Sequence, residues 1–363
     1  MDINVSNIKG YVDNPYSLLN MCRVNNTSLC SLATVIAYLS IYYLPFIIFL
    51  GISTNILIIY IFWIGTKKKS RQIIYLGAMA LADIGNILVM GVFWFIPTKG
   101  IPFITNGRYY FITINHSNFL CVFHRFLISF FSCLTSNYFV LISIDRVLAI
   151  YFPMKFKLIP IKYSWILVAI VAVLSFLLMI PIIFGLKWQV TKDYYLLCAL
   201  KGELYWRIYN ILFGNCGLVA AIIVVILNLA LVIRLLQIKR FRRDLQEHHP
   251  NMEIFQKQEI PACILLILIS FIFISLSLPM VVSNLLEFYP QYVKGDTEAA
   301  RYFYSIYDIS WILFVTQCSA NWIIYMCRMK SFREKNLKIF KCKIFFSKFK
   351  NELKTLRRCD NII

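Results

Sequence analysis

Charged residues are scarce in this chain, and acidic residues are scarcer still. Only 15% of the 363 residues are charged, with 17 Asp and Glu against 37 Lys and Arg, whereas 60% are hydrophobic. Soluble domains hold about 45–50% apolar and about 25% charged residues, and the mean hydropathy of this chain is +0.70. The composition excludes an ordinary soluble domain, and we expect lipid to surround most of the chain.

Histidine is equally rare, and its positions argue against a membrane enzyme. The four histidines are His116, His124, His248 and His249, which we place in connections or near the mouth of a helix bundle. An intramembrane hydrolase needs paired Asp residues, a Ser–His pair or zinc ligands inside its spans. We therefore predict no enzymatic activity. A transporter or channel stays as the alternative, although the sequence shows no repeat with Gly- or Pro-interrupted helices in both halves.

A continuous apolar core is missing from residues 1–32, so no cleavable signal peptide is expected. The first apolar run would then act as the insertion signal. About 20 apolar residues cross a bilayer, and the chain holds seven candidate spans. We predict them at 33–64, 71–96, 118–151, 162–186, 204–238, 258–288 and 302–326.

The net charge of +20 is distributed as a membrane protein would distribute it, which disfavours a nucleic-acid partner. Lys and Arg cluster in the first, third and fifth connections and in the tail, and these segments are expected to face the cytoplasm. Seven crossings give the same result. We therefore predict an extracellular segment at 1–32, a transmembrane domain at 33–326 and a cytoplasmic segment at 327–363. The connection between the second and third spans looks unusually long.

An acid–base pair, Asp145-Arg146, ends the third span in the run Ser-Ile-Asp-Arg-Val-Leu-Ala-Ile-Tyr-Phe-Pro. Ionisable groups at that depth are costly and indicate a functional site. The second span holds Leu-Gly-Ala-Met-Ala-Leu-Ala-Asp up to Asp83, Cys121 opens the third span, and Trp165 lies in the fourth. With seven spans, this set resembles the rhodopsin-like G-protein-coupled receptors over about residues 33–342. Val147 replaces the Tyr that usually follows the Arg.

The resemblance implies an all-α membrane protein, a seven-helix bundle followed by a short amphipathic eighth helix. It implies a receptor in the plasma membrane that passes the binding of an extracellular ligand to a heterotrimeric G protein. The mixed charged and aromatic outer rim is similar to the peptide-receptor branch, so a peptide is the expected ligand. The lipid bilayer is the other expected partner.

The same resemblance assigns a switch at the cytoplasmic end. Arg146 would pair with Asp145 and with Glu259, which precedes Pro279 by the family's spacing. Pro279 would kink the sixth helix. Asn321 and Tyr325 stand in a variant of Asn-Pro-x-x-Tyr in which Trp322 replaces the Pro. As an alternative, the Asp-Arg pair only lies at the membrane surface with its side chains reaching the headgroups.

A sodium pocket is implied at mid-membrane, with Asp83 as the charged ligand. Its other members would be Asn55, Thr135 and Asn321, and oxygen ligands suit a hard cation. The alternative is a protonated Asp83 hydrogen-bonded to Asn55 and Asn321. No other cofactor is expected.

The expected ligand contacts lie toward the outer ends of the third, sixth and seventh spans. Arg125 is the leading candidate, with the alternative that it reaches outer phosphates. At the position where amine receptors carry an Asp this chain has Ile128, and no Lys lies in the seventh span, so amine and retinal ligands are excluded. The full set is His124, Arg125, Ile128, Asn284, Glu287, Tyr307, Asp308 and Trp311.

Covalent features follow the same topology. The resemblance implies a disulfide between Cys121 and Cys198, with two free outer thiols as the alternative, and Cys22 with Cys30 is a second candidate pair. Cys342 lies in a basic amphipathic stretch and is the candidate for palmitoylation. Glycosylation sequons on the expected outer side begin at Asn4, Asn25, Asn26 and Asn115.

Overall fold

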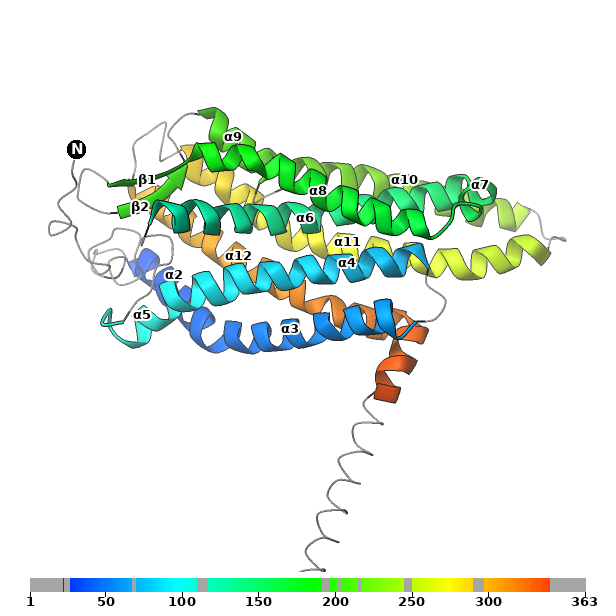
Figure 1. The fold of residues 1–363 in the computed structure, drawn as a ribbon, viewed down its shortest axis with the longest axis horizontal. Coiled ribbons are helices and arrows are strands. Elements are labelled where there is room, and N and C mark those ends of the chain that lie inside the picture. The colour runs from blue at the N-terminus through cyan, green and yellow to red at the C-terminus, as the bar shows by residue number, and fades with distance from the viewer. Residues whose placement is uncertain are drawn as a thin grey trace, which may run out of the picture.

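In the computed structural model the chain forms a bundle of long helices that run side by side along its longest axis (Figure 1). The structure describes Cys22 and residues 27–66, 70–109, 117–190, 196–200, 204–214, 217–244, 250–289 and 297–339. Within these residues, 7 helices are long and apolar enough to cross a membrane. The predicted seven-helix fold is confirmed. We name the two ends of the bundle after Cys121 and Asp145, which the topology prediction places outside and in the cytoplasm.

The first two spans are built from α-helical and wider π-helical segments. The first consists of α2 (Thr27–Tyr38), η3 (Leu39–Tyr43), α3 (Leu44–Ile59) and η4 (Tyr60–Ile64). The second consists of α4 (Arg71–Asn86), η5 (Ile87–Gly100) and α5 (Ile101–Ile104). In these wide turns a backbone N–H reaches the carbonyl five residues earlier, as from Ile101 to Ile96.

The remaining spans are longer and mostly regular. They are α6 (Asn118–Tyr151), α8 (Lys162–Gly185), α9 (Leu204–Phe213) with α10 (Leu218–Asp244), α11 (Pro250–Tyr289) and α12 (Thr297–Arg328). The short helix α7 (Pro153–Lys157) follows α6, and a hairpin of β1 (Leu186–Val190) and β2 (Leu196–Leu200) follows α8. Residues 330–339 form a further helical stretch, which leaves the end of α12 at a steep angle (Figure 1).

Local sequence explains where several helices begin. The hydroxyl of Ser117 accepts a hydrogen bond from the Leu120 N–H at 3.1 Å and caps α6. Ser70 caps α4 in the same way through Ile73. Pro153 stands in the first turn of α7, where its missing N–H costs nothing. Capping by Ser70 and Ser117 therefore fixes the residues at which α4 and α6 begin.

Burial separates the central helices from the lipid-facing ones. In the most apolar stretch of the α4 and α6 spans 67% of residues are buried, against 17% in α8. At the core, Phe139 of α6 stacks on Phe273 of α11 with ring centroids 4.4 Å apart. Trp165 of α8 packs edge-on against Trp63 at 5.2 Å. The apolar outer faces of α8 and α10 are what a lipid solvent accepts.

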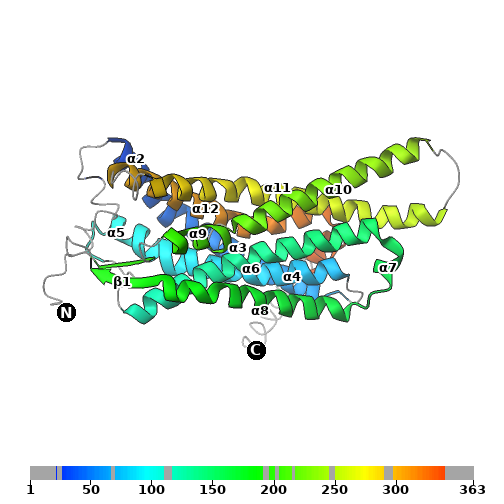
Figure 2. The same ribbon diagram turned by 90° about the horizontal axis from the view of Figure 1, so that it is seen from above.

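The second span is longer than its predicted end at residue 96, and this corrects two expectations. The helix continues through Pro97 to Ile104, so residues 97–104 of the predicted long connection before Cys121 are helical. Lys99, which falls in a connection by the predicted bounds, is buried inside η5. The first span likewise begins at Thr27 rather than at residue 33, and α11 begins at Pro250 rather than at residue 258. Figure 2 shows α10 and α11 extending past the other helices at the Asp145 end.

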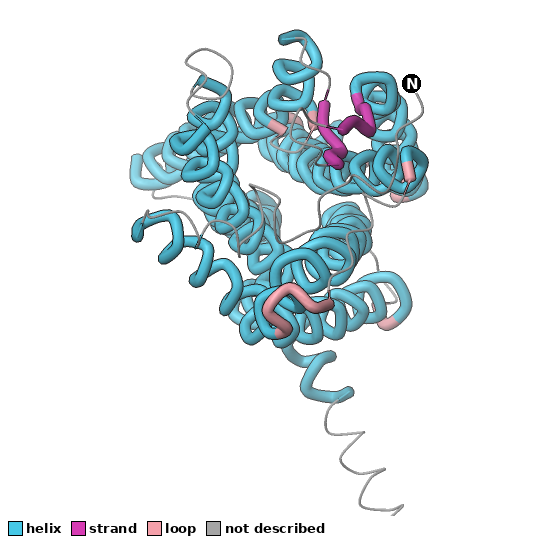
Figure 3. Tube along the Cα trace, turned by 90° about the vertical axis from the view of Figure 1, so that its left-hand side faces the viewer, coloured by secondary structure: helices cyan, strands magenta, loops and turns pink. Residues whose placement is uncertain are grey.

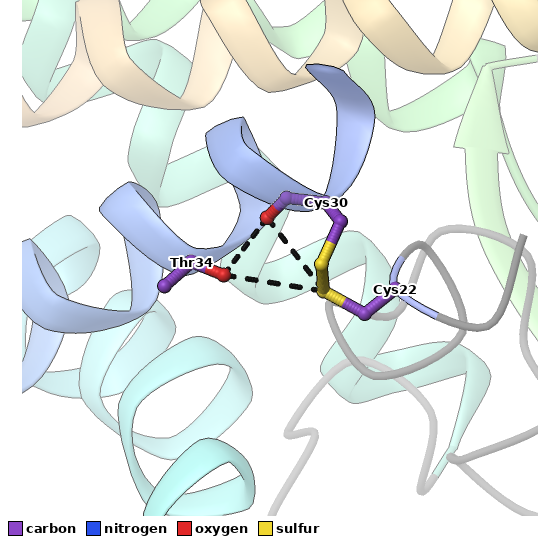
Figure 4. The surroundings of a disulfide bond; sticks show 3 residues. All are labelled: Cys22, Cys30 and Thr34. Atoms are coloured by element: carbon purple, nitrogen blue, oxygen red, sulfur yellow. Dashed lines mark hydrogen bonds between the residues drawn. A yellow bond between two sulfur atoms is a disulfide. The ribbon is translucent and has the colours of Figure 1, made fainter. Parts of the chain in front are cut away.

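Two disulfides fasten the Cys121 end. Cys121 is bonded to Cys198 of β2, which attaches the hairpin to the first turn of α6. Viewed from that end, the hairpin lies over the bundle (Figure 3). The second disulfide joins Cys22 to Cys30 in the first turn of α2, where Thr34 donates to the Cys30 carbonyl at 2.8 Å (Figure 4). Both predicted pairings are confirmed.

The fifth span is interrupted, in contrast to the continuous helix predicted over 204–238. Helix α9 ends at Phe213 and α10 begins at Leu218. Gly217 between them has a φ of +52°, a conformation that other residues rarely adopt. A Cβ there would also press against the Ser136 side chain of α6. The break therefore depends on glycine and lies against the third span.

Candidate functional site

The predicted Asp145–Arg146 pair is buried at the end of α6. Only 5% of Asp145 and 6% of Arg146 is exposed. The Arg146 Nε donates to Asp145 Oδ2 at 3.1 Å, and Nη2 donates to the same oxygen. A charged pair with so little water is hydrogen-bonded rather than extended to headgroups, so the alternative of a surface pair is not supported.

A second arginine, which sequence reasoning had treated as a basic loop residue, approaches the same carboxylate. Arg71 Nε lies 3.9 Å from Asp145 Oδ1. Its guanidinium stacks 3.4 Å from the Phe156 ring centroid, and Nη2 donates to the Phe156 carbonyl at 2.6 Å. Arg71 thus connects the start of α4, the end of α6 and α7. Its place directly after a helix cap was the only sequence signal.

The outcome differs among three other residues of the predicted switch. Glu259 falls within α11, but its side chain lies outside the described residues, so its pairing with Arg146 stays a prediction. Pro279 is accommodated inside α11, where the Ser283 hydroxyl donates to its carbonyl at 2.7 Å. Tyr325 is fully buried between Phe62 and Phe332, with ring centroids 5.6 and 5.8 Å away. Its hydroxyl has no hydrogen-bond partner among the described residues.

A polar cluster surrounds Asp83 at the centre of the bundle. Asn321 Nδ2 donates to Asp83 Oδ2 at 2.8 Å, and the Thr135 hydroxyl donates to Oδ1 at 3.3 Å. The Cys318 thiol also bonds to this carboxylate. Asn86 adds a layer that sequence reasoning missed, since its Nδ2 donates to Thr135 Oγ1 at 3.0 Å. Asp83 therefore joins the second, third and seventh spans.

Asn55 does not contact Asp83 directly, contrary to the hydrogen bond considered for it. Its Nδ2 donates to the carbonyls of Gly51 and Cys318, each at 2.9 Å, and its Oδ1 is buried without a partner. The donor set still suits a monovalent cation, because the Asp83 carboxylate and the Thr135 hydroxyl supply oxygen atoms that converge. The thiol of Cys318 is a poorer ligand for such an ion.

At the Cys121 end, a buried ion pair joins the second and seventh spans. Lys99 Nζ lies 2.7 Å from Asp308 Oδ2, and the two side chains are only 5% and 3% exposed. The Lys99 ammonium also lies 5.1 Å from the Tyr304 ring centroid. Asp308 was a predicted ligand contact, whereas Lys99 lies beyond the predicted end of the second span at residue 96 and was not among the predicted site residues.

The wide turns of η5 also decide on which face of the helix Lys99 lies. From Asp83 a regular α-helix turns by about 100° per residue and would leave Lys99 roughly 160° away, on the opposite face. In π-helical η5 each backbone N–H bonds to a carbonyl five residues back rather than four, so each turn holds more residues and Lys99 lies on a different face from the one that a regular α-helix would give it. The position of Lys99 is therefore decided by the backbone form of η5.

At the same end of the bundle, Arg125 and His124 of α6 both approach η5. The Arg125 guanidinium lies 5.3 Å from the Trp94 ring centroid, and the His124 ring lies 5.9 Å from the same ring. His124 Nε2 is 3.3 Å from the Val89 carbonyl, while Nδ1 is buried without a partner. Arg125 is half-buried beside an aromatic ring rather than extended into water.

The other predicted ligand residues separate into three groups. Tyr307 and Trp311 pack edge to face at 6.0 Å on α12, and Ile128 is buried on α6. The side chains of Asn284 and Glu287 lie outside the described residues. The predicted glycosylation and palmitoylation sites also lie outside them, namely Asn4, Asn25, Asn26, Asn115 and Cys342.

Residues 54–325 match the family described as the 7 transmembrane receptor (rhodopsin family). The match spans most of the chain, and the chain belongs to this family. No curated protein sequence gives a significant match. Family membership makes the chain a multi-pass membrane protein of the G-protein-coupled receptor class, a class of signalling receptors without enzymatic activity. An extracellular ligand and a G protein are the partners that the class implies.

Proposed function

We propose that this chain is a plasma-membrane receptor that passes the binding of an extracellular peptide to a heterotrimeric G protein. The observation that carries the proposal is the buried Asp145–Arg146 pair, because a discrete hydrogen-bonded pair can act as a two-state element. In this proposal the Cys121 end faces outward, and the basic Asp145 end faces the cytoplasm.

The resting state keeps Arg146 against Asp145, where it cannot reach a partner protein. A ligand at the Cys121 end acts by binding more tightly to a second arrangement of the helices, in which Arg146 is released. Each charge-assisted hydrogen bond contributes about 1.5–3 kcal/mol. A difference of this size biases a population strongly without making the resting state permanent.

The Asp83 cluster has a natural part in this scheme. We propose that it holds a sodium ion through the Asp83 carboxylate and the Thr135 hydroxyl in the resting arrangement. The ion would supply a positive charge that neutralises Asp83. The purified chain should unfold at a higher temperature in sodium chloride than in potassium chloride at equal ionic strength, and Asp83→Asn should abolish the difference. Equal temperatures in both salts for the wild type would rule out a sodium site.

Nucleotide exchange tests the receptor function directly. Wild type and Arg146→Ala are expressed at matched surface levels with a panel of G proteins and screened against a peptide library. We expect a basal or peptide-dependent signal that Arg146→Ala removes. Conductance or solute flux that persists in Arg146→Ala, without any exchange signal, would instead establish the transporter or channel alternative.

A further inference from the structure

Among the described residues at the Cys121 end, two cations and one anion lie near one another in a poorly hydrated place. Lys99 and Arg125 are cations, and Asp308 is the anion between the second, third and seventh spans. Both cations act electrostatically on Asp308, so the three groups lie in one neighbourhood. Lys99 already pairs with Asp308 at 2.7 Å, which leaves the Arg125 charge in excess.

No carboxylate lies within ion-pair distance of Arg125 in the part of the chain that the structure describes. Its one close partner there is the Trp94 ring, at 5.3 Å. A cation over an aromatic face gains about 0.5–2 kcal/mol, less than a carboxylate offers. Its planar guanidinium can bind a carboxylate through two parallel hydrogen bonds.

His124 adds a hydrogen-bonding atom beside the same ring. Its Nε2 faces the Val89 carbonyl, which can only accept, so Nε2 carries the proton in the neutral ring. Nδ1 is then an acceptor, and it is buried, in a residue that is 4% exposed, without a partner among the residues that the structure describes. Buried acceptors of this kind normally accept a hydrogen bond. No donor among the described residues reaches His124 Nδ1.

A cation and a hydrogen-bond acceptor, carried by neighbouring residues of α6 that lie 5.3 and 5.9 Å from the Trp94 ring centroid, match one chemical group. We propose that Arg125, His124 and the Lys99–Asp308 pair bind a carboxylate that carries a neighbouring amide N–H, as at the C-terminus of a peptide. The carboxylate pairs with Arg125, and its amide N–H donates to His124 Nδ1. The Lys99–Asp308 pair fixes the second and seventh spans around this site. The inference rests on the proposed receptor function and specifies its ligand chemistry.

The test uses two small probes that differ only in the acidic group. N-acetyl-phenylalanine and N-acetyl-phenylalanine amide are compared by ligand-observed NMR on the purified full chain in lipid nanodiscs. We expect the wild type to bind the acid at least about tenfold more tightly than the amide. Arg125→Gln should remove that preference. The control Arg301→Gln removes an arginine of α12 near the same end of the bundle and should keep the preference.

Three outcomes would overturn the inference: equal binding of acid and amide, no binding of the acid to the wild type, or an unchanged preference in Arg125→Gln. Thermal unfolding checks that each variant is folded, and Arg125→Lys, which keeps the charge without the planar fork, should retain part of the preference. The binding test contains no G protein. Acid preference without any nucleotide exchange would refute the receptor function alone, and exchange without acid preference would refute this inference alone.

Discussion

Asp145→Asn separates the charge of the buried pair from its shape. The amide replaces the carboxylate with almost no change in volume, so packing at the end of α6 is retained. What is lost is the attraction for Arg146, which now makes two hydrogen bonds to Oδ2. Arg71, 3.9 Å from Oδ1, would also lose its counter-ion and repel Arg146. Both effects favour the state in which Arg146 is released.

The size of the effect follows from the geometry. A charge-assisted hydrogen bond of this kind contributes about 1.5–3 kcal/mol, and the low exposure of both residues leaves little solvent screening. Since about 1.4 kcal/mol corresponds to a tenfold change in a population ratio, Asp145→Asn should raise the released population roughly tenfold to a hundredfold.

Ligand-free nucleotide exchange on a purified G protein measures this population. We expect a higher basal rate for Asp145→Asn than for the wild type at equal receptor amounts in nanodiscs. The double variant Asp145→Asn/Arg146→Ala serves as the control and should return to the rate without receptor. A basal rate for Asp145→Asn equal to that of the wild type, in a folded protein, would show that the pair does not restrain signalling.

Further variants test three other sets of contacts in the structure. Arg71→Gln should lower the free energy of unfolding by about 2 kcal/mol, because it removes a charged hydrogen bond and a stacked ring; unchanged thermal unfolding would argue against that anchor, and Arg71→Lys should recover part of the loss. Asp308→Asn should destabilise the chain by about 3–5 kcal/mol because Lys99 is left buried and unpaired, and adding Lys99→Met should restore most of it; no rescue in surface expression would contradict this reasoning. Cys121→Ser should cost about 4.5 kcal/mol and Cys22→Ser about 2.5 kcal/mol, since the closed loops differ so much in length; equal melting temperatures of the two variants would refute the loop-entropy argument.

Local sequence patterns predicted the features that depend on whether a residue lies in lipid or in water. Apolar runs longer than a bilayer's thickness predicted the seven spans that the structure confirms. The orientation, which basic residues in alternate connections indicate, stays a prediction. The acid–base pair at Asp145-Arg146 and the acid at Asp83 stood out because a charge in an apolar run is costly wherever the helix lies. The paired cysteines followed from the expected topology and the family resemblance.

Contacts between distant segments were beyond those patterns. Arg71 belongs to a basic connection by composition, and only the tertiary structure brings it to Asp145 and Phe156. Asn55 shares the centre of the bundle with Asp83 but bonds to backbone carbonyls instead. A side chain's partner depends on rotations and translations of whole helices, which a one-dimensional pattern does not contain.

Lys99 shows what the sequence determined and what only the tertiary structure decided. The sequence determined that this chain spans a membrane seven times, because transfer of apolar surface depends on composition and length alone. Whether Lys99 lies in a loop, faces lipid or pairs with Asp308 was decided by the wide turns of η5. Helical phase accumulates over many residues, so a small change in residues per turn moves a charge from one face of the helix to the other.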